Sequence, residues 1–229
     1  EYIHDTFKHN PLISTAFAPH APYTVSDDSL KRIAVLAEEL DIPIHMHIHE
    51  TNDEIEQSIK QYGKRPLSRL SDLGLLSSRL IAVHMTQLEK NEINELKRTR
   101  VSIAHCPESN LKLASGFCPI GKLQKNNINV CIGTDGAASN NDLNMLGEMH
   151  TSALLAKGIS NDSTCSDAHT TLKMATLNGA KALGLSKSIG SLKKGKQADI
   201  VAIDLNQIET IPLYDPLSQI IYAADRRQI

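Results

Sequence analysis

Short apolar runs alternate with amphipathic segments along most of this 229-residue chain. The runs are rich in Ile, Val and Ala, and the segments between them space their apolar residues three to four apart, as helices do. Strands are predicted at 42–50, 79–86, 100–107 and 128–136, and the segment 13–24 is predicted to begin as a strand and end in a Pro-rich loop. Helices are predicted to begin at Ser26 and at Thr51, which forms a capping box with Glu54, and to span about 89–97, 120–125, 143–157 and 167–183. A polar loop is predicted between the strand 100–107 and the helix 120–125. A repeated strand-then-helix order implies parallel strands with right-handed crossovers, so the fold class is α/β.

Two architectures fit this pattern, an open doubly wound sheet and a (β/α)8 TIM-type barrel. A Gly-rich phosphate turn is missing, which weakens the dinucleotide-binding form of the open sheet. Polar residues stand where the strands end, and barrel enzymes build their sites there. These residues are His20, His47 to Glu50, His84, His105 and Asp135. Five units are too few to close a barrel, so we expect only its second half, strands 4 to 8, and a fragment of a longer protein.

The pattern changes near Ile189. The segment "IGSLKKGKQADIVAIDL" predicts two short strands around a Lys/Gly turn. We therefore expect residues 1–187 to form the half barrel. Residues 188–229 are expected to form part of a small β-sandwich domain, followed by a C-terminal tail.

The composition narrows the class of protein further. Hydrophobic residues make up 41% and charged residues 22%, which suits a folded globular chain. The net charge of -2 and the 3% aromatic content give no sign of a nucleic-acid or membrane surface. The four cysteines have no Cys-x-x-Cys spacing and are expected to be reduced and buried. No signal peptide or long apolar stretch is visible, so a cytoplasmic location is expected.

Three histidines alternate along one predicted strand, at His45, His47 and His49. A two-residue period sends all three to one face, and two of them can approach one metal ion. The alternative is a row of surface histidines on an edge strand. Glu50 follows directly and can move protons if burial raises its pKa, or it is a solvated residue at a helix start.

The remaining candidates also lie at strand ends. Asp135, in "GTDGAASNN", can ligate a metal or accept a proton, or it only forms a turn. His84 and His20 are expected to be functional, and His105 is open between a functional and a core role. Histidine and carboxylate donors without a thiolate suit Zn2+ or Fe2+ with an activated water. Neither the Cys-rich zinc deaminase signature nor a Gly-x-Ser-x-Gly elbow is present.

Five ordered motifs carry a family resemblance over nearly the whole chain: "APHAPYT", "IHMHIHET", "AVHMT", "HCPESNLKLASG" and "GTDGAASNN". They resemble the strand-end motifs of the amidohydrolase superfamily. They are most similar to those of 5-methylthioadenosine/S-adenosylhomocysteine deaminases and the related triazine and atrazine hydrolases. The segment "GSLKKGKQADIVAID" resembles the family's return into its small β-sandwich domain.

The resemblance implies a hydrolytic deaminase that converts adenine to hypoxanthine and releases ammonia. It implies that His47 and Asp135 are metal ligands and that Asp135 is also the general base. It implies that Glu50 contacts the substrate and protonates its ring nitrogen, that His84 orients the attacking water, and that His20 contacts the sugar. One divalent metal is expected, zinc before iron or manganese, since strand 4 lacks a bridging Lys.

One departure from the family limits this expectation. The His-x-His pair of strand 1, which supplies two further ligands, does not precede His20. A site with two ligands binds metal weakly, so the fragment as it stands is expected to be inactive.

The expected binding partner is a small-molecule substrate, a nucleoside or another heterocycle, and the protein is expected to form a homo-oligomer. Guanine, 8-oxoguanine or an s-triazine is the alternative substrate, and a non-catalytic barrel scaffold is the alternative class.

Overall fold

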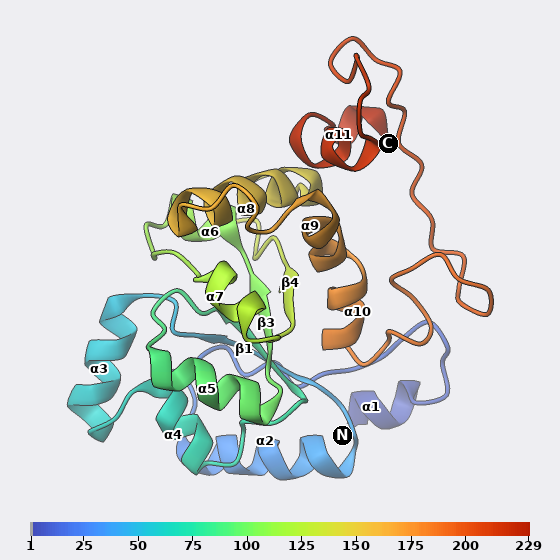
Figure 1. The fold of residues 1–229 in the computed structure, drawn as a ribbon. Coiled ribbons are helices and arrows are strands. Elements are labelled where there is room, and N and C mark those ends of the chain that lie inside the picture. Colours follow the sequence, from blue (N-terminus) through green and yellow to red (C-terminus); the bar gives the residue numbers. More distant parts are fainter. Residues whose placement is uncertain (1) are drawn as a thin grey trace.

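One parallel sheet of four strands organises the chain (Figure 1). The computed structural model describes residues 2–229. The strands follow in sequence order as β1 Ile44–Ile48, β2 Leu80–His84, β3 Ser102–His105 and β4 Val130–Ile132. Every adjacent pair is parallel, so the predicted α/β class is confirmed.

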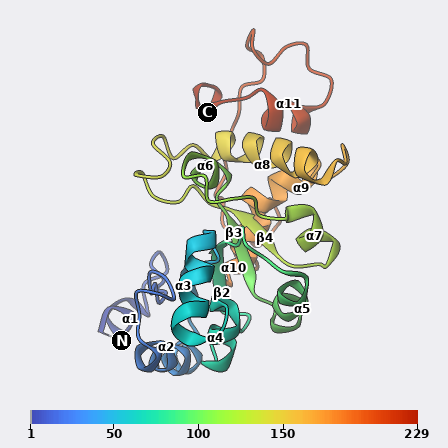
Figure 2. The ribbon, with the colours of Figure 1, turned by 90° about the vertical axis from the view of Figure 1, so that its left-hand side faces the viewer.

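Helices connect and cover these strands. The first six are α1 Tyr2–Phe7, α2 Asp27–Glu39, α3 Asn52–Tyr62, α4 Pro66–Asp72, α5 Lys90–Thr99 and α6 Pro107–Lys112. The remainder are α7 Ile120–Lys125, α8 Met145–Ser160, α9 Ala168–Ala175, α10 Leu177–Ala182, α11 Pro216–Tyr222 and the short 3-10 helix η1 Arg226–Gln228. In Figure 2, α2 to α4 gather at one end of the molecule, and α8 and α11 lie at the other.

The segment 13–24, predicted to begin as a strand and end in a Pro-rich loop, does not form a strand. Phe17 makes a single parallel bridge to Ile44, with the Phe17 N–H donating to the Pro43 carbonyl at 2.9 Å. Pro19 and Pro22 have no N–H to donate, which prevents a continuous ladder. The segment still runs beside β1, at the edge of the sheet away from β2, and the sheet is open.

The two faces of the sheet differ in what they bury. Ile44, Met46 and Ile48 of β1 join Ile103 and Val130 in the main hydrophobic core, on the helix-covered face. The opposite face carries His45 and His47 of β1 and a smaller apolar group, which consists of Ile81, Val83, Ala104, Cys106, Cys131 and Ala182. The β1–β2 register pairs His45 with Ile81 and His47 with Val83, so this second face combines apolar and imidazole groups.

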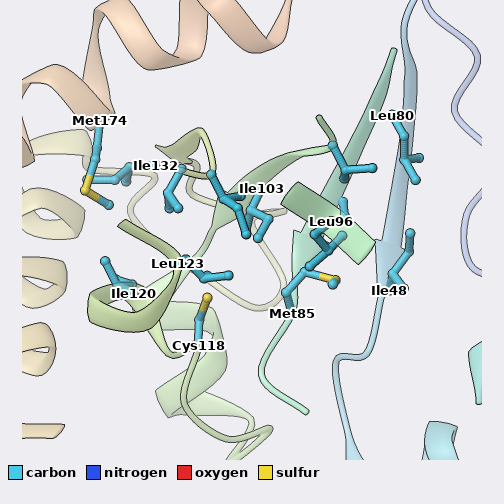
Figure 3. Close-up of a cluster of buried hydrophobic side chains, with 14 of the residues drawn as sticks. Ile48, Leu80, Met85, Leu96, Ile103, Cys118, Ile120, Leu123, Ile132 and Met174 are labelled. Carbon is cyan, nitrogen blue, oxygen red and sulfur yellow. The ribbon is translucent and has the colours of Figure 1, made fainter. Parts of the chain in front are cut away.

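The main core is built where the helices meet the first face. Figure 3 shows side chains from strands and helices in contact, with Leu96 of α5 and Leu123 of α7 facing the strand residue Ile103. These three side chains have no exposed surface. Burial of apolar side chains is the main favourable term in folding, so this layer holds the strands in place.

Residues at the helix ends explain where several helices begin and end. The Ser26 hydroxyl accepts from the Ser29 N–H and caps α2, as predicted. The expected helix at 167–183 is instead two, because the backbone of Thr176 leaves the helical region with φ -128° and ψ -92°. Helix α6 was predicted as a polar loop, although Pro107 at its first turn is a recognised start signal.

No strand forms between residues 189 and 205 in the described part of the chain, so the two strands predicted there are not observed. Ile200 and Val201 are 64% and 67% exposed. An extended segment becomes a strand only when another backbone supplies a ladder of hydrogen bonds. The described residues supply only isolated ones here, from the Gln197 N–H to the Ser188 carbonyl and from the Asp204 N–H to the Gln228 carbonyl. Figure 1 shows this segment leaving the sheet before α11 returns to pack through Ile221.

The core position of Leu96 generates a stability prediction. Leu96→Ala removes a fully buried side chain and leaves a cavity, so it is expected to lower the free energy of unfolding by about 2–5 kcal/mol. Lys97→Ala, on the exposed side of the same helix, is the matched control and is expected to change it by less than about 0.5 kcal/mol. Urea denaturation of the full-length protein measures both values. Equal effects would contradict the placement of α5.

Candidate metal centre

Three possible ligand atoms converge at the carboxyl edge of the sheet. His47 of β1, His84 at the end of β2 and Asp135 after β4 offer atoms that all lie within 4.8 Å of one another. They are 37 and 51 residues apart along the chain, and parallel strands bring them to one edge. The structure therefore brings together three of the residues that the sequence singled out.

Left-handed backbone conformations shape this edge. His49, His84 and Asp135 have φ values of 55°, 74° and 60°, which non-glycine residues rarely adopt. Strain of this kind persists where surrounding structure enforces it, and it is often found at functional sites. By strand alternation, His84 belongs with Leu80 and Ala82 on the helix-covered face. Its positive φ breaks that alternation, and its ring stacks on His47 with centroids 5.3 Å apart.

His49 departs from the predicted face for the same reason. Its backbone turns at the strand end, and its ring is fully buried, where Nε2 accepts from the Leu67 N–H at 3.1 Å. Burial lowers the pKa of His49 to about 4, despite the nearby Glu92 carboxylate. The expectation that all three histidines share one face is therefore wrong for His49, which supports α4 as a neutral side chain. His45 is exposed and does not belong to the cluster.

His47 is oriented by a main-chain group. The His20 carbonyl accepts from the His47 backbone N–H at 3.1 Å and lies 2.8 Å from its Nδ1. A carbonyl can only accept, so Nδ1 carries the proton and the Nε2 lone pair is free. Nε2 lies 3.7 Å from Asp135 Oδ1, beyond hydrogen-bonding distance. The exposed ring of His20 lies edge-on to the His47 ring, with centroids 5.1 Å apart.

Asp135 is held by two hydroxyls. Ser109 Oγ and Ser139 Oγ donate to Oδ2 at 2.8 and 2.5 Å. Burial alone would raise the pKa of Asp135, but the two serine hydrogen bonds, with the Gly136 N–H and His84, outweigh it, and the pKa falls below its usual value. Asp135 is therefore a carboxylate at neutral pH, and its Oδ1 faces His47.

His84 and Glu50 face each other across the cluster. His84 Nε2 lies 3.7 Å from Glu50 Oε2, and its Nδ1 lies 2.8 Å from Asn110 Oδ1. Burial lowers the pKa of His84, and the Glu50 charge opposes this only in part, so a neutral ring is favoured. Ser115 Oγ donates to Glu50 Oε1 at 3.3 Å.

The backbone of Glu50 is fixed from both sides. The Glu54 carboxylate accepts from the N–H groups of His49 and Glu50 at 3.1 and 2.7 Å, and Thr86 Oγ1 donates to the Glu50 carbonyl at 2.6 Å. The predicted Thr51–Glu54 capping box is thus half formed, because the Thr51 side chain caps Glu54 while the Glu54 side chain serves the turn before the helix.

His105 lies apart from the cluster. It is 3% exposed, neither ring nitrogen has a partner among the described residues, and burial lowers its pKa to about 3. It is therefore neutral. Of the two possibilities left open for His105, the structure favours the core role.

Sequence reasoning missed the residues that support the cluster. Ser109, Asn110 and Ser115 lie outside the strand ends and carry neither imidazole nor carboxylate, and Glu54 was expected only as a helix-capping residue. The only available signal was the polar run Glu108-Ser109-Asn110 directly after an apolar strand and a proline.

The cluster fits a divalent cation chemically. Two imidazole nitrogens and an ionised carboxylate are donors that suit Zn2+, Fe2+ or Mn2+. Two ligands about 2.1 Å from one tetrahedral zinc stand about 3.4 Å apart, close to the 3.7 Å between His47 Nε2 and Asp135 Oδ1. The fixed tautomer of His47 also leaves its lone pair available.

An open parallel sheet with this donor set at its carboxyl edge defines the class as a metal-binding α/β protein. The chain belongs to the amidohydrolase family, whose sequence model matches residues 1–229. A protein from Teredinibacter turnerae named 5-methylthioadenosine/S-adenosylhomocysteine deaminase is 51% identical over 228 residues, which cover 97% of this chain and 52% of that protein. The chain therefore spans about half the length of the curated relatives it matches.

Solved structures give the same family. The crystal structure of an adenosine deaminase from Xanthomonas campestris with bound zinc matches with a TM-score of 0.98 and 58% identity, over 99% of this chain and 52% of that one. Atrazine chlorohydrolase from Arthrobacter aurescens, crystallised with zinc, matches with a TM-score of 0.90 and 27% identity, over 97% and 50%. In residues 2–229, no helix is long and apolar enough to cross a membrane.

A buried carboxyl links two of the elements around the cluster. Glu148 of α8 has no exposed surface, accepts from the Glu108 N–H of α6 at 3.2 Å, and contacts the side-chain amide of Asn140 in the loop after β4. Burial, together with the charges of Glu108 and Asp142, raises the pKa of Glu148 from 4.5 to about 8. Glu148 is therefore protonated over much of the neutral range.

This raised pKa makes stability depend on pH. The native state keeps a proton that the unfolded chain releases, so the free energy of unfolding is expected to fall as the pH rises from 4.5 to about 8. Glu148→Gln removes the titration and is expected to flatten this part of the curve. Denaturation of the full-length protein at a series of pH values measures the slope. An unchanged slope in the variant would exclude Glu148 as its source.

Proposed function

We propose that the complete protein is a metal-dependent hydrolytic deaminase. Its substrate is the adenine ring of 5'-methylthioadenosine or S-adenosylhomocysteine, and its products are the corresponding hypoxanthine nucleoside and ammonia. The observation that carries the proposal is the convergence of His47, His84 and Asp135 within 4.8 Å, with Glu50 directed at His84. The names of the relatives at 51% and 52% identity support the choice of substrate.

We infer that residues 1–187 are the second half of a (β/α)8 barrel, strands 4 to 8. The open sheet and the match to about half of each relative support this proposal. We infer that residues 188–229 return into a small β-sandwich, where a partner strand pairs with the extended segment around Ile200. Two further histidine ligands are expected from the rest of the protein. A homo-oligomer stays a prediction that rests on the resemblance, and a cytoplasmic location stays a prediction from the sequence.

The proposed chemistry assigns one task to each side chain. His47 and Asp135 would hold the metal, whose Lewis acidity lowers the pKa of water and supplies the nucleophile when bound. Asp135, ionised and hydrogen-bonded on Oδ2, accepts the proton of the water through Oδ1. Glu50 protonates the ring nitrogen, and His84 orients the water. The exposed His20 ring contacts the sugar. Water adds at C6, the bond from C6 to the amino nitrogen breaks, and ammonia leaves with the proton that Asp135 accepted. The C6 hydroxyl proton returns to Glu50 as the carbonyl of hypoxanthine forms.

The main alternative to a nucleoside substrate within this family is another heterocycle. The triazine-type relative is only 27% identical, against 51% for the nucleoside deaminase from Teredinibacter turnerae. This difference favours the nucleoside. Guanine, 8-oxoguanine and s-triazines therefore belong in the same assay as competing substrates.

The function is tested on the full-length protein loaded with Zn2+. Deamination of S-adenosylhomocysteine and methylthioadenosine shifts the ultraviolet absorbance from adenine to hypoxanthine. Glu50→Gln keeps the size of the side chain but removes its titrating proton, so kcat is expected to fall at least about 100-fold. Glu56→Gln, an exposed carboxylate of α3, is the control and is expected to retain activity. A wild-type protein that turns over only guanine or a triazine would overturn the substrate assignment.

Metal content tests the ligand assignment separately. Loss of an imidazole that ligates a metal weakens binding sharply, so full-length His47→Ala is expected to contain well under one equivalent of zinc after dialysis. His45→Ala removes a neighbouring histidine outside the cluster and is expected to keep the wild-type stoichiometry. Elemental analysis measures both. Equal zinc content in the two variants would exclude His47 as a ligand.

A further inference from the structure

Helix α6 directs two adjacent side chains to two different strands. Ser109 donates to Asp135 Oδ2 at 2.8 Å, and Asn110 Oδ1 lies 2.8 Å from His84 Nδ1. Ser109 has no exposed surface and Asn110 is 2% exposed. A helix that the sequence predicted as a loop is therefore in direct contact with two residues of the cluster.

The contact with Asn110 determines which nitrogen of His84 carries the proton. An amide oxygen can only accept, so Nδ1 at 2.8 Å must donate. In a neutral ring the other nitrogen then has a free lone pair. That nitrogen, Nε2, points into the cluster and lies 3.7 Å from Glu50 Oε2. The opposite tautomer would present a proton to the same space.

Asn110 is itself held firmly. Its backbone N–H donates to the Cys106 carbonyl at 3.0 Å, and its carbonyl accepts from the Ser115 N–H at 2.9 Å. The Glu148 carboxyl accepts from the Glu108 N–H and fixes the start of the helix to α8. The backbone of Asn110 is therefore fixed, and the contact to His84 Nδ1 is what orients its side-chain amide, because the amide nitrogen has no hydrogen-bond partner among the described residues.

We propose that Asn110 is a positioning residue for His84. It holds the ring with Nδ1 protonated and keeps the Nε2 lone pair directed at the reacting centre. This role rests on the proposed deaminase function, in which His84 orients the attacking water. Asn110 acts through His84 and does not itself touch the substrate.

The tautomer of His84 is measured directly by long-range 15N–1H correlation spectra of the full-length protein labelled with 15N-histidine. His84→Asn identifies the His84 signals by their loss. The wild type is expected to show Nδ1 protonated. Asn110→Leu has similar volume but no acceptor, and it is expected to lose the single Nδ1–H form. Asn110→Asp keeps an acceptor oxygen and is expected to keep Nδ1 protonated.

Ser109→Ala is the matched control, since it removes the neighbouring hydrogen bond to Asp135 and leaves Asn110 in place. It is expected to leave the His84 tautomer unchanged. In the zinc-loaded enzyme, Asn110→Leu is expected to lower kcat about 10- to 100-fold, as other lost orienting contacts do, with KM changed less than about twofold.

Two results would overturn the proposal. One is a wild-type His84 protonated on Nε2 alone, which means that the amide NH2 of Asn110 donates to the ring. The other is a folded Asn110→Leu with the wild-type spectrum and the wild-type kcat. If Asn110→Leu does not fold, the wild-type and Asn110→Asp spectra still decide the tautomer. The spectra do not depend on turnover, so an inactive wild type would defeat the proposed function and leave the role of Asn110 decidable.

Discussion

The parallel pairing of β1 to β4 is the constraint on which the site depends. Parallel strands place all their carboxyl ends at one edge, so residues as distant along the chain as His47 and Asp135 meet there. The hydrophobic layer beneath, with Leu96 and Leu123 fully buried, maintains this pairing. The energy of folding is thus gained on one face of the sheet, while the polar groups converge at its edge.

Several residues that orient these converging groups are in conformations or environments that destabilise the folded state. Positive φ at His84 and Asp135 is unfavourable for side chains with a Cβ, and Glu148 is buried where its charged form is disfavoured. Each of these costs is accompanied by a contact: the His84 ring stacks on His47, Asp135 receives two hydroxyls, and Glu148 joins α6 to α8. These features lower the local stability around the cluster, and the contacts that accompany them fix the orientation of its side chains.

The periodic part of this arrangement was predictable from sequence, and the irregular part was not. Apolar alternation predicts four of the strands and most helices. The strand-end rule selects His47, Glu50, His84 and Asp135, but it also selects His105, which lies outside the cluster. Alternation failed at His49, because a single positive φ reverses the direction of a side chain and has no signal in residue type. It also failed at Asn110, whose helix is too short to show a period. The prediction of two strands near Ile200 was wrong for a third reason. A strand forms only when another strand pairs with it, and the sequence of the segment alone does not show whether such a strand is present.

The two imidazoles of the cluster are oriented by different kinds of acceptor. His47 bonds to the main-chain carbonyl of His20, and His84 bonds to the side chain of Asn110. Every amino acid carries a carbonyl, so no codon change at position 20 deletes the acceptor of His47, and only a shift of the chain can remove it. A single codon change at position 110 deletes the acceptor of His84. One imidazole is thereby protected against point mutation, and the other is open to adjustment by selection.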